Sequence, residues 1–226
     1  MREDTQLLHF AGHVFEPLAS GALYWRAENA LLVADLHLEK MSSFARQGQL
    51  LPPYDTGLTL KRLDSDLTAT GARSLIALGD SFHRDYGPQS LSHQDRTTIA
   101  QMCARADWFW LSGNHDPAPH ALGGQCMAQL ERGGLVLTHE PRRGTPGLMA
   151  GHLHPAAHIY INGRAIRRPC FVNDGQLLIL PAYGASTGNL NILDRAFADL
   201  LDFSSLAITM LGRDRLYPVS PRRLIA

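Results

Sequence analysis

The sequence has few cysteines and almost no lysine. Its three cysteines are Cys103, Cys126 and Cys170, and none belongs to a Cys-x-x-Cys pair. This usage is typical of reduced thiols and excludes both a disulfide framework and a cysteine-rich zinc site. Only Lys40 and Lys61 are lysines among the 21 basic residues. The excess of arginine is what a GC-rich genome produces, and it also suits the binding of phosphate groups.

The chain also lacks a charge excess, a signal peptide and a long apolar segment. Its 226 residues include 21 basic and 21 acidic side chains, which excludes a histone-like polycation and an acidic tail. The first residues, MREDTQ, are polar, and no stretch approaches the roughly 18 apolar residues of a membrane span. Without an internal repeat or a low-complexity linker, we expect one domain over residues 1–226 that lies in the cytoplasm.

Short apolar runs alternate with helical patterns, which predicts the α/β class. Helices are expected over residues 55–69 and 92–105, the second opening with the capping pattern of Ser92 and Asp95. Strands are expected at 7–15, 21–26, 30–34, 74–78, 107–111, 134–138, 148–150, 158–161, 165–172 and 176–180, followed by a hairpin of 206–210 and 215–219.

Five of the predicted strands end abruptly in acidic, amide or imidazole side chains. These residues are Asp35 and His37; Asp80; Asn114, His115 and Asp116; His139; and His152 and His154. In α/β sheets, ligands bind at the carboxyl ends of strands. We therefore expect the five strand ends to meet at one site, although they are spread over 120 residues of sequence.

Two aspartates, one asparagine and four histidines offer oxygen and nitrogen donors without a thiolate, a set that suits Mn, Fe, Zn or Co. Seven donors are too many for one tetrahedral ion, but with one shared carboxylate they suit two ions about 3.5–4 Å apart. Such a pair stabilises the attacking and leaving oxygens of a phosphoryl transfer and makes hydroxide available near neutral pH. His115 is then left without a metal and is a candidate general acid, oriented by Asp116.

The ordered motifs D-x-H, GD, GNHD, a lone His and GHxH resemble the calcineurin-like metallophosphoesterase superfamily over residues 30–155. The resemblance implies a four-layer αββα sandwich with two mixed β-sheets. It places Asp35, His37 and His154 at a first metal, Asp80 as the bridging carboxylate, and Asn114, His139 and His152 at a second metal. It also implies that His115 contacts the scissile phosphate and leaving group, with Asp116 as its partner.

A narrower resemblance extends over nearly the whole chain. The segments DLHLEK (35–40), LGDSFHR (78–84), THEP (138–141), GHLHP (151–155) and LPAYGASTGN (180–189) are similar to those of the ligase-associated DNA damage response endonucleases. This resemblance implies a bacterial enzyme, usually Mn²⁺-dependent, that nicks single-stranded DNA. It also implies a functional association with a DNA ligase and a helicase of the same repair pathway.

Substrate contacts are less well defined by the sequence. Many superfamily members carry N-x-x-D after the GD motif, whereas this chain has Ser-Phe-His-Arg. His83, with Arg84 beside it, can therefore contact substrate phosphate or a metal-bound water, or lie in a solvated loop. Arg142 and Arg143 belong to a run of five arginines without a carboxylate between Glu140 and Asp174. They either rim the site and attract a polyanionic backbone or form a solvated face. Tyr183 is a candidate for base stacking.

Two other functions remain open. One is a phosphodiesterase or phosphatase for a small molecule such as a cyclic nucleotide, although little sequence lies outside the motifs to form a cap domain. The other is an inactive phosphoesterase fold that serves as a binding module. Because His115 and all seven ligand positions are intact, the sequence favours an enzyme.

Overall fold

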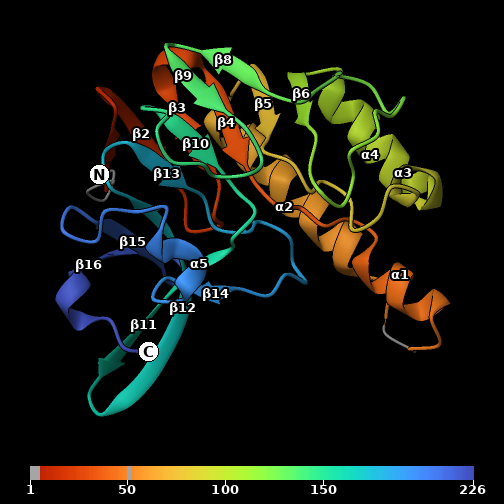
Figure 1. Ribbon diagram of the computed structural model, residues 1–226. Coiled ribbons are helices and arrows are strands. Elements are labelled where there is room, and N and C mark those ends of the chain that lie inside the picture. Colours follow the sequence, from red (N-terminus) through yellow and green to blue (C-terminus); the bar gives the residue numbers. More distant parts are fainter. Residues whose placement is uncertain (1–5, 50–51) are drawn as a thin grey trace.

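The computed structural model describes residues 6–49 and 52–226, which form two mixed β-sheets with helices on the outside (Figure 1). The α/β architecture expected from the sequence is confirmed. Helices α1 to α4 gather on one side of the molecule, and β11 to β16 on the other. Within the described part of the chain, no helix is long and apolar enough to cross a membrane.

The first sheet has seven strands in the described part of the chain, in the order β1 to β7. They are β1 (Leu8–Phe10), β2 (His13–Pro17), β3 (Leu23–Trp25), β4 (Ala30–Val33), β5 (Ser74–Ala77), β6 (Asp107–Leu111) and β7 (Gln125–Met127). The first four strands are antiparallel neighbours, and β4 to β7 run parallel to one another. The ends of β4, β5 and β6 therefore lie at the same edge of the sheet.

The second sheet has nine strands among the described residues, in the order β14-β11-β12-β13-β10-β9-β8, with β15 paired to β12 and β16 to β15. They are β8 (Leu130–Arg132), β9 (Leu135–Leu137), β10 (Leu148–Ala150), β11 (Pro155–Ile161), β12 (Arg164–Asn173), β13 (Leu177–Ile179), β14 (Leu190–Asn191), β15 (Ala207–Leu211) and β16 (Leu216–Val219). Strand β10 runs parallel to β9 and β13. The ends of β9 and β10 thus lie together.

Helices flank both sheets. They are α1 (Lys40–Arg46), α2 (Asp55–Thr70), α3 (Gly87–Ser90), α4 (His93–Cys103) and α5 (Arg195–Ala198), with 3₁₀ turns at Arg26–Glu28 and Pro221–Arg223. The expected cap of α4 is confirmed, because the Ser92 hydroxyl oxygen accepts a hydrogen bond from the Asp95 amide at 3.1 Å.

Alternating side chains of the strands produce the layers. Leu31 and Leu75 pack with α2 and α4, whereas Leu32 and Ile76 point the other way, into the core between the two sheets. On the outer face of the second sheet, Phe197 of α5 belongs to a third core cluster. The order helix, sheet, sheet, helix is that of the predicted four-layer sandwich, with a fourth layer reduced to one short helix.

The structure corrects some element boundaries. Residues 7–15 were expected as one strand, but Ala11 and Gly12 have φ values of 47° and 81° and form the turn between β1 and β2. Two successive positive φ values are typical of a tight hairpin turn. The strand expected at 158–161 begins earlier, at Pro155, and α1, α3, α5, β7, β8 and β14 were not predicted. These elements are short, so their periodicity is too weak to be recognised.

Candidate metal centre

The seven predicted ligand residues converge, as expected, at one edge of the β-sandwich. Asp35, Asp80 and Asn114 follow the parallel strands β4, β5 and β6 of the first sheet. His139 and His152 follow the parallel strands β9 and β10 of the second sheet. The two sheets face each other, so the five strand ends surround a common space.

One group of donors consists of Asp35, His37 and His154, whose ligand atoms all lie within 4.8 Å of one another. His154 Nε2 is 3.3 Å from Asp35 Oδ1 and also 3.3 Å from His37 Nε2. Asp35 and His37 are buried and His154 is partly exposed. The three side chains could hold one metal ion.

A second group consists of Asn114, His139 and His152. Asn114 Oδ1 lies 2.9 Å from His139 Nε2 and 3.0 Å from His152 Nδ1, and the two ring nitrogens are 3.1 Å apart. Asp80 lies between the groups, because its Oδ1 is 3.4 Å from His139 Nε2 and its Oδ2 is 3.7 Å from His37 Nε2. Asp80 is therefore placed where a carboxylate shared by two ions would have to be.

The hydrogen bonds of two candidate ligand histidines fit a cation in this space. His139 Nδ1 lies 3.0 Å from the Leu78 carbonyl oxygen, and His154 Nδ1 lies 3.1 Å from the Gly188 carbonyl oxygen. A carbonyl only accepts, so both Nδ1 atoms must carry the proton, and in each neutral ring Nε2 is left with a lone pair. The His139 lone pair faces another acceptor, Asn114 Oδ1, and His154 Nε2 faces the carboxylate oxygen Asp35 Oδ1. A divalent ion in this space would be coordinated by the two Nε2 atoms together with these oxygens.

Burial keeps several of these imidazoles neutral, as metal ligation requires. The pKa of His37 is lowered to about 2, chiefly by burial and then by the neighbouring His154. Burial and the nearby His139 also lower the pKa of His152. For His154, burial acts in the same direction, but the hydrogen bond and charge of Asp35 raise its pKa above the ordinary value. With nitrogen and oxygen donors and no thiolate, the site suits borderline divalent metals.

The backbone is strained at the ligands themselves. Asp35, His37, Asp80, His152 and His154 have φ values of 54°, 43°, 47°, 72° and 47°. Left-handed backbone at a residue with a side chain costs about 1–2 kcal/mol and persists only where the surrounding structure imposes it. Concentrated at five ligands, this strain is typical of a functional site.

The glycines of the motifs provide space for the ligand side chains. A Cβ at Gly79 would lie 2.5 Å from the His139 ring. One at Gly113 would lie 2.1 Å from Asp80 Oδ1, and one at Gly151 would lie 2.6 Å from Asp35 Oδ2. The GD, GNHD and GHxH motifs therefore each need a glycine, because a candidate ligand from another motif occupies the space that a side chain would fill.

His115 lies beside the two donor groups with its side chain 35% exposed. Its Nε2 is 3.9 Å from Asp80 Oδ2, and its amide donates to Asp80 Oδ1 at 2.9 Å. The ring contacts His37 edge-on, with centroids 5.2 Å apart. His115 is thus held next to the metal ligands with its ring reachable from outside, as an acid that protonates a leaving group requires.

Asp116 is not the partner of His115 that the sequence predicted. Its two carboxylate oxygens accept hydrogen bonds from the backbone amides of Gly113, at 3.1 Å, and Phe82, at 2.9 Å. Burial raises the pKa of Asp116 to about 7 against the opposing effect of these amides. Asp116 instead ties the loop that carries Asn114 and His115 to the turn that follows Asp80.

The structure brings His83 into the site. It is nearly buried, and its ring stacks on that of His115 with centroids 5.3 Å apart and planes inclined by 22°. Phe44 of α1 packs edge-on against the other side, at 5.4 Å. Burial, followed by the charge of Lys40, lowers the pKa of His83 to about 4. Arg84, the next residue, is exposed beside it.

The remaining substrate candidates lie elsewhere. Tyr183 is fully buried, its hydroxyl donates to Asp66 Oδ2 at 2.8 Å, and the Arg62 guanidinium lies 4.3 Å from its ring centroid. The ring is therefore part of the core and is not available to stack on a base. Arg142 and Arg143 line a separate cavity of about 380 Å³ together with Asp174 and Asp202, and no ligand residue lines it.

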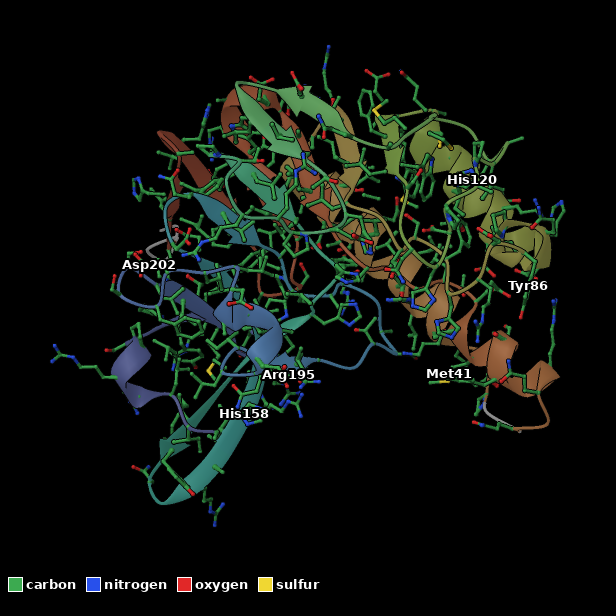
Figure 2. All side chains as sticks on the ribbon, in the orientation of Figure 1. Met41, Tyr86, His120, His158, Arg195 and Asp202 are labelled. Atoms are coloured by element: carbon green, nitrogen blue, oxygen red, sulfur yellow. The ribbon has the colours of Figure 1, made fainter. Side chains whose placement is uncertain are left out.

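His158, which was expected to be structural, lies on β11. Figure 2 shows it far from Met41 and Tyr86, which lie at the end of the molecule formed by α1 and α3. It belongs to none of the donor groups found among the described residues. Sequence reasoning missed the carbonyls of Leu78 and Gly188, because a backbone acceptor leaves no mark on the sequence.

No protein-family model and no curated protein matches the chain. Among solved structures, the chain is similar to the Pseudomonas putida nuclease MPE, with 29% sequence identity and a TM-score of 0.72 over 95% of this chain and 99% of that one. A phosphoesterase from E. coli, Yfce, shares 15% identity over 87% of this chain and 96% of its own, with a TM-score of 0.40, a likeness too distant to carry an argument.

The similarity to the nuclease MPE extends over nearly the whole of both chains, so it includes both sheets and the segments that carry the seven donors. The two mixed sheets match the calcineurin-like phosphoesterase fold expected from the sequence. The donor set at their common edge and the similarity to the nuclease together support a metal-dependent phosphoesterase.

Proposed function

We propose that the protein is an endonuclease that cleaves phosphodiester bonds of single-stranded DNA with two divalent metal ions, Mn²⁺ being the favoured metal. The observation that carries the proposal is the position of Asp80 between the two donor groups, with the partly exposed His115 ring beside it. The similarity to a nuclease supports a nucleic acid as the substrate, and the resemblance of the sequence motifs favours DNA. A role in DNA repair, together with a ligase and a helicase in the bacterial cytoplasm, stays a prediction from the sequence resemblance.

The metal ions would be held by Asp35, His37 and His154 on one side and by Asn114, His139 and His152 on the other, with Asp80 shared. When bound, they supply charge neutralisation of the phosphate oxygens and a water made acidic enough to attack near neutral pH. Asp80 also accepts a hydrogen bond from the backbone amide of His115. The shared carboxylate therefore also fixes the backbone of the residue that acts as the general acid.

His115 donates its proton to the departing sugar oxygen, which is a poor leaving group as an alkoxide. Asp116 accepts the amides of Gly113 and Phe82 and so fixes the loop on which His115 lies. His83 packs against the His115 ring and limits its rotation. The chain thereby orients one proton donor toward the space bounded by the two donor groups.

The test uses circular single-stranded DNA, because a molecule without ends can be cut only by an endonuclease. Metal is stripped from the protein, Mn²⁺ is added back, and linear product is measured by electrophoresis for the wild type and for His115→Ala. We expect cleavage that requires both Mn²⁺ and His115.

The result that would contradict a DNA substrate is intact circular DNA together with rapid hydrolysis of bis(4-nitrophenyl) phosphate by the same sample. That result would favour a small-molecule diester as the substrate. If neither substrate is hydrolysed with any divalent metal that binds, the phosphodiesterase proposal itself fails.

A further inference from the structure

Two hollows on the surface meet at one arginine. The first, of about 270 Å³, is lined by Arg62, Arg168 and the loop that contains Gly184 and Gly188. The second, of about 330 Å³, is lined by Arg168 again and by Arg213, Tyr217 and Arg223. Leu211 and Gly212 also line both. The two hollows therefore adjoin at these three residues, and we treat them together as a groove from the 184–188 loop across β12 to the turn between β15 and β16.

The groove is positively charged. None of the residues that line either hollow is an aspartate or a glutamate. Two other cavities differ, since Glu16 and Asp66 line one of them and Asp174 and Asp202 the other. Segments 155–173 and 207–226 contain seven arginines against one acidic side chain, Asp214; the arginines are 164, 167, 168, 213, 215, 222 and 223. Although the net charge of the whole chain is zero, these segments are positively charged and attract polyanions.

The first hollow adjoins the candidate metal centre. The carbonyl of Gly188, which lines the first hollow, accepts the hydrogen bond from Nδ1 of the ligand His154 at 3.1 Å. The guanidinium of Arg167, on β12, donates to the carbonyl of the next residue, Asn189. Arg62, which lines the first hollow, donates to the Tyr183 carbonyl, and its guanidinium lies 4.3 Å from the centroid of the Tyr183 ring. Its Nε is buried and has no hydrogen-bond partner among the residues that the structure describes.

The second hollow combines this charge with an apolar floor. Its lining includes Ile159, Ile166 and Met210, and Tyr217 is 41% exposed, with the Arg215 guanidinium 5.1 Å from the centroid of its ring. Gly212 is required here, because a Cβ at this position would lie 2.5 Å from the Tyr217 ring. Figure 1 shows β15 and β16 beside β12, on the side of the molecule away from α1 to α4. Cations at the edge and an aromatic, apolar floor are the features with which proteins hold unpaired nucleotides.

We propose that this groove binds the single strand that flanks the cleaved phosphate, with Arg62 and Arg168 at the backbone next to the metal centre and Arg213, Arg223 and Tyr217 at the nucleotides beyond it. The proposal deepens the proposed function and rests on it. A free phosphate or a small diester would fill only the first hollow, whereas the continuity at Arg168 favours a polymer. An extended strand also explains why the basic residues lie on a face that contains no metal ligand.

Binding is measured without cleavage, by fluorescence anisotropy of a labelled 20-nucleotide oligo(dT) in EDTA. The variant is Arg168→Glu/Arg213→Glu, and the matched control is Arg73→Glu, an exposed arginine outside both hollows. We expect the double variant to bind at least tenfold more weakly and the control to bind like the wild type. The slope of log K against log salt should become shallower by about 0.7 for each lost phosphate contact.

Two milder substitutions test the second hollow without reversing a charge, and circular dichroism checks that each variant is folded. Tyr217→Ala should weaken binding about tenfold through lost stacking, while Tyr217→Phe, which keeps the ring, should bind like the wild type. With Mn²⁺, the double variant should raise KM for the oligonucleotide more than it raises KM for bis(4-nitrophenyl) phosphate, because only the polymer extends into the second hollow.

The experimental results distinguish a failure of the groove proposal from a failure of the proposed function. If the wild type cuts circular DNA but the groove variants bind and cut like Arg73→Glu, the groove is not the strand site and the proposed function stands. If the wild type neither binds nor cuts DNA but hydrolyses the aryl diester, the proposed function and the groove are both overturned.

Discussion

The imidazole of His83 stacks on that of His115, with ring centroids 5.3 Å apart and planes inclined by 22°. The first ring is enclosed, since Phe44 packs on its other side, whereas the second is partly exposed beside the metal ligands. The buried His83 ring thus limits the orientation of the accessible His115 ring. This arrangement assigns His83 a positioning role and excludes the solvated loop that was one of its two alternatives in the sequence.

We expect His83→Ala to lower kcat about tenfold with little change in metal content, because small misplacements of a catalytic group are costly. His83→Phe, which replaces one flat ring by another, should retain most of kcat. Steady-state kinetics with DNA and metal analysis of each variant test this. If His83→Phe is as impaired as His83→Ala, the ring nitrogens of His83 contact substrate and packing is not its role.

The loss caused by His115→Ala should depend on the leaving group. A general acid contributes typically 10²–10⁴-fold, and we expect a loss of that size with DNA, whose sugar oxygen needs a proton. With bis(4-nitrophenyl) phosphate the loss should be much smaller, because 4-nitrophenolate leaves without one. Metal content, measured by plasma mass spectrometry, should match the wild type. Equal losses on both substrates, or loss of metal, would refute the acid role.

Asp80→Ala should remove both metal ions together, because Asp80 is the carboxylate that contacts both donor groups. Metal content per chain is measured after dialysis against low Mn²⁺. Asp199→Ala, which replaces an exposed carboxylate outside the site, serves as the control. An Asp80→Ala protein that retains two tightly bound ions would show that the carboxylate is not shared.

Gly113→Ala should disturb the metal centre although no ligand is changed. The added Cβ would lie 2.1 Å from Asp80 Oδ1 and 2.2 Å from the Asp80 backbone nitrogen, so the loop or the ligand must move. We expect loss of metal and a decrease of about 1–3 kcal/mol in the free energy of unfolding. Gly57→Ala, in α2 with its nearest atom at 3.8 Å, should instead stabilise the protein by up to about 1 kcal/mol. Denaturant titrations of the two metal-free variants compare these effects, and a stable, metal-loaded Gly113→Ala would contradict the steric explanation.

Bound metal should stabilise the fold for two reasons. It would coordinate acceptor atoms that otherwise repel one another, and its binding energy would offset the cost of the left-handed backbone at the ligands. At 100 times the dissociation constant, the gain is about 2.7 kcal/mol. For a chain of this size, that corresponds to a rise in Tm of roughly 5–11 °C. Differential scanning calorimetry with and without Mn²⁺ measures it, and Asp80→Ala should show no such rise. A wild-type Tm that does not respond to any divalent metal would argue against a metal centre.

The convergence of the candidate metal ligands could be predicted because each is marked locally. Asp35, Asp80 and His139 each follow a short apolar run, and the carboxyl ends of parallel strands meet wherever such a sheet forms. The order of layers followed from the same runs, since alternate side chains of a buried strand must face two different cores. Resemblance added the expected family and the acid role that we propose for His115.

Predictions that needed the partner of a side chain were less successful. Asp116 follows His115 directly in the sequence, yet its carboxylate turns to Gly113 and Phe82. Tyr183 lies in a glycine-rich segment that suggested an exposed loop, but α2 supplies the Arg62 and Asp66 that enclose it. Neither outcome is visible from neighbours in the sequence.

The sequence by itself determined which residues end the strands, where the glycines had to be and which donors could bind metal, because these depend on short-range pattern and on the chemistry of each side chain. Only the tertiary structure decided that five ligands take a left-handed backbone, that His83 supports His115, and that Arg62 and Arg213 lie along one groove. These relationships join elements far apart in the chain, and they are set by how the two sheets and the helices pack.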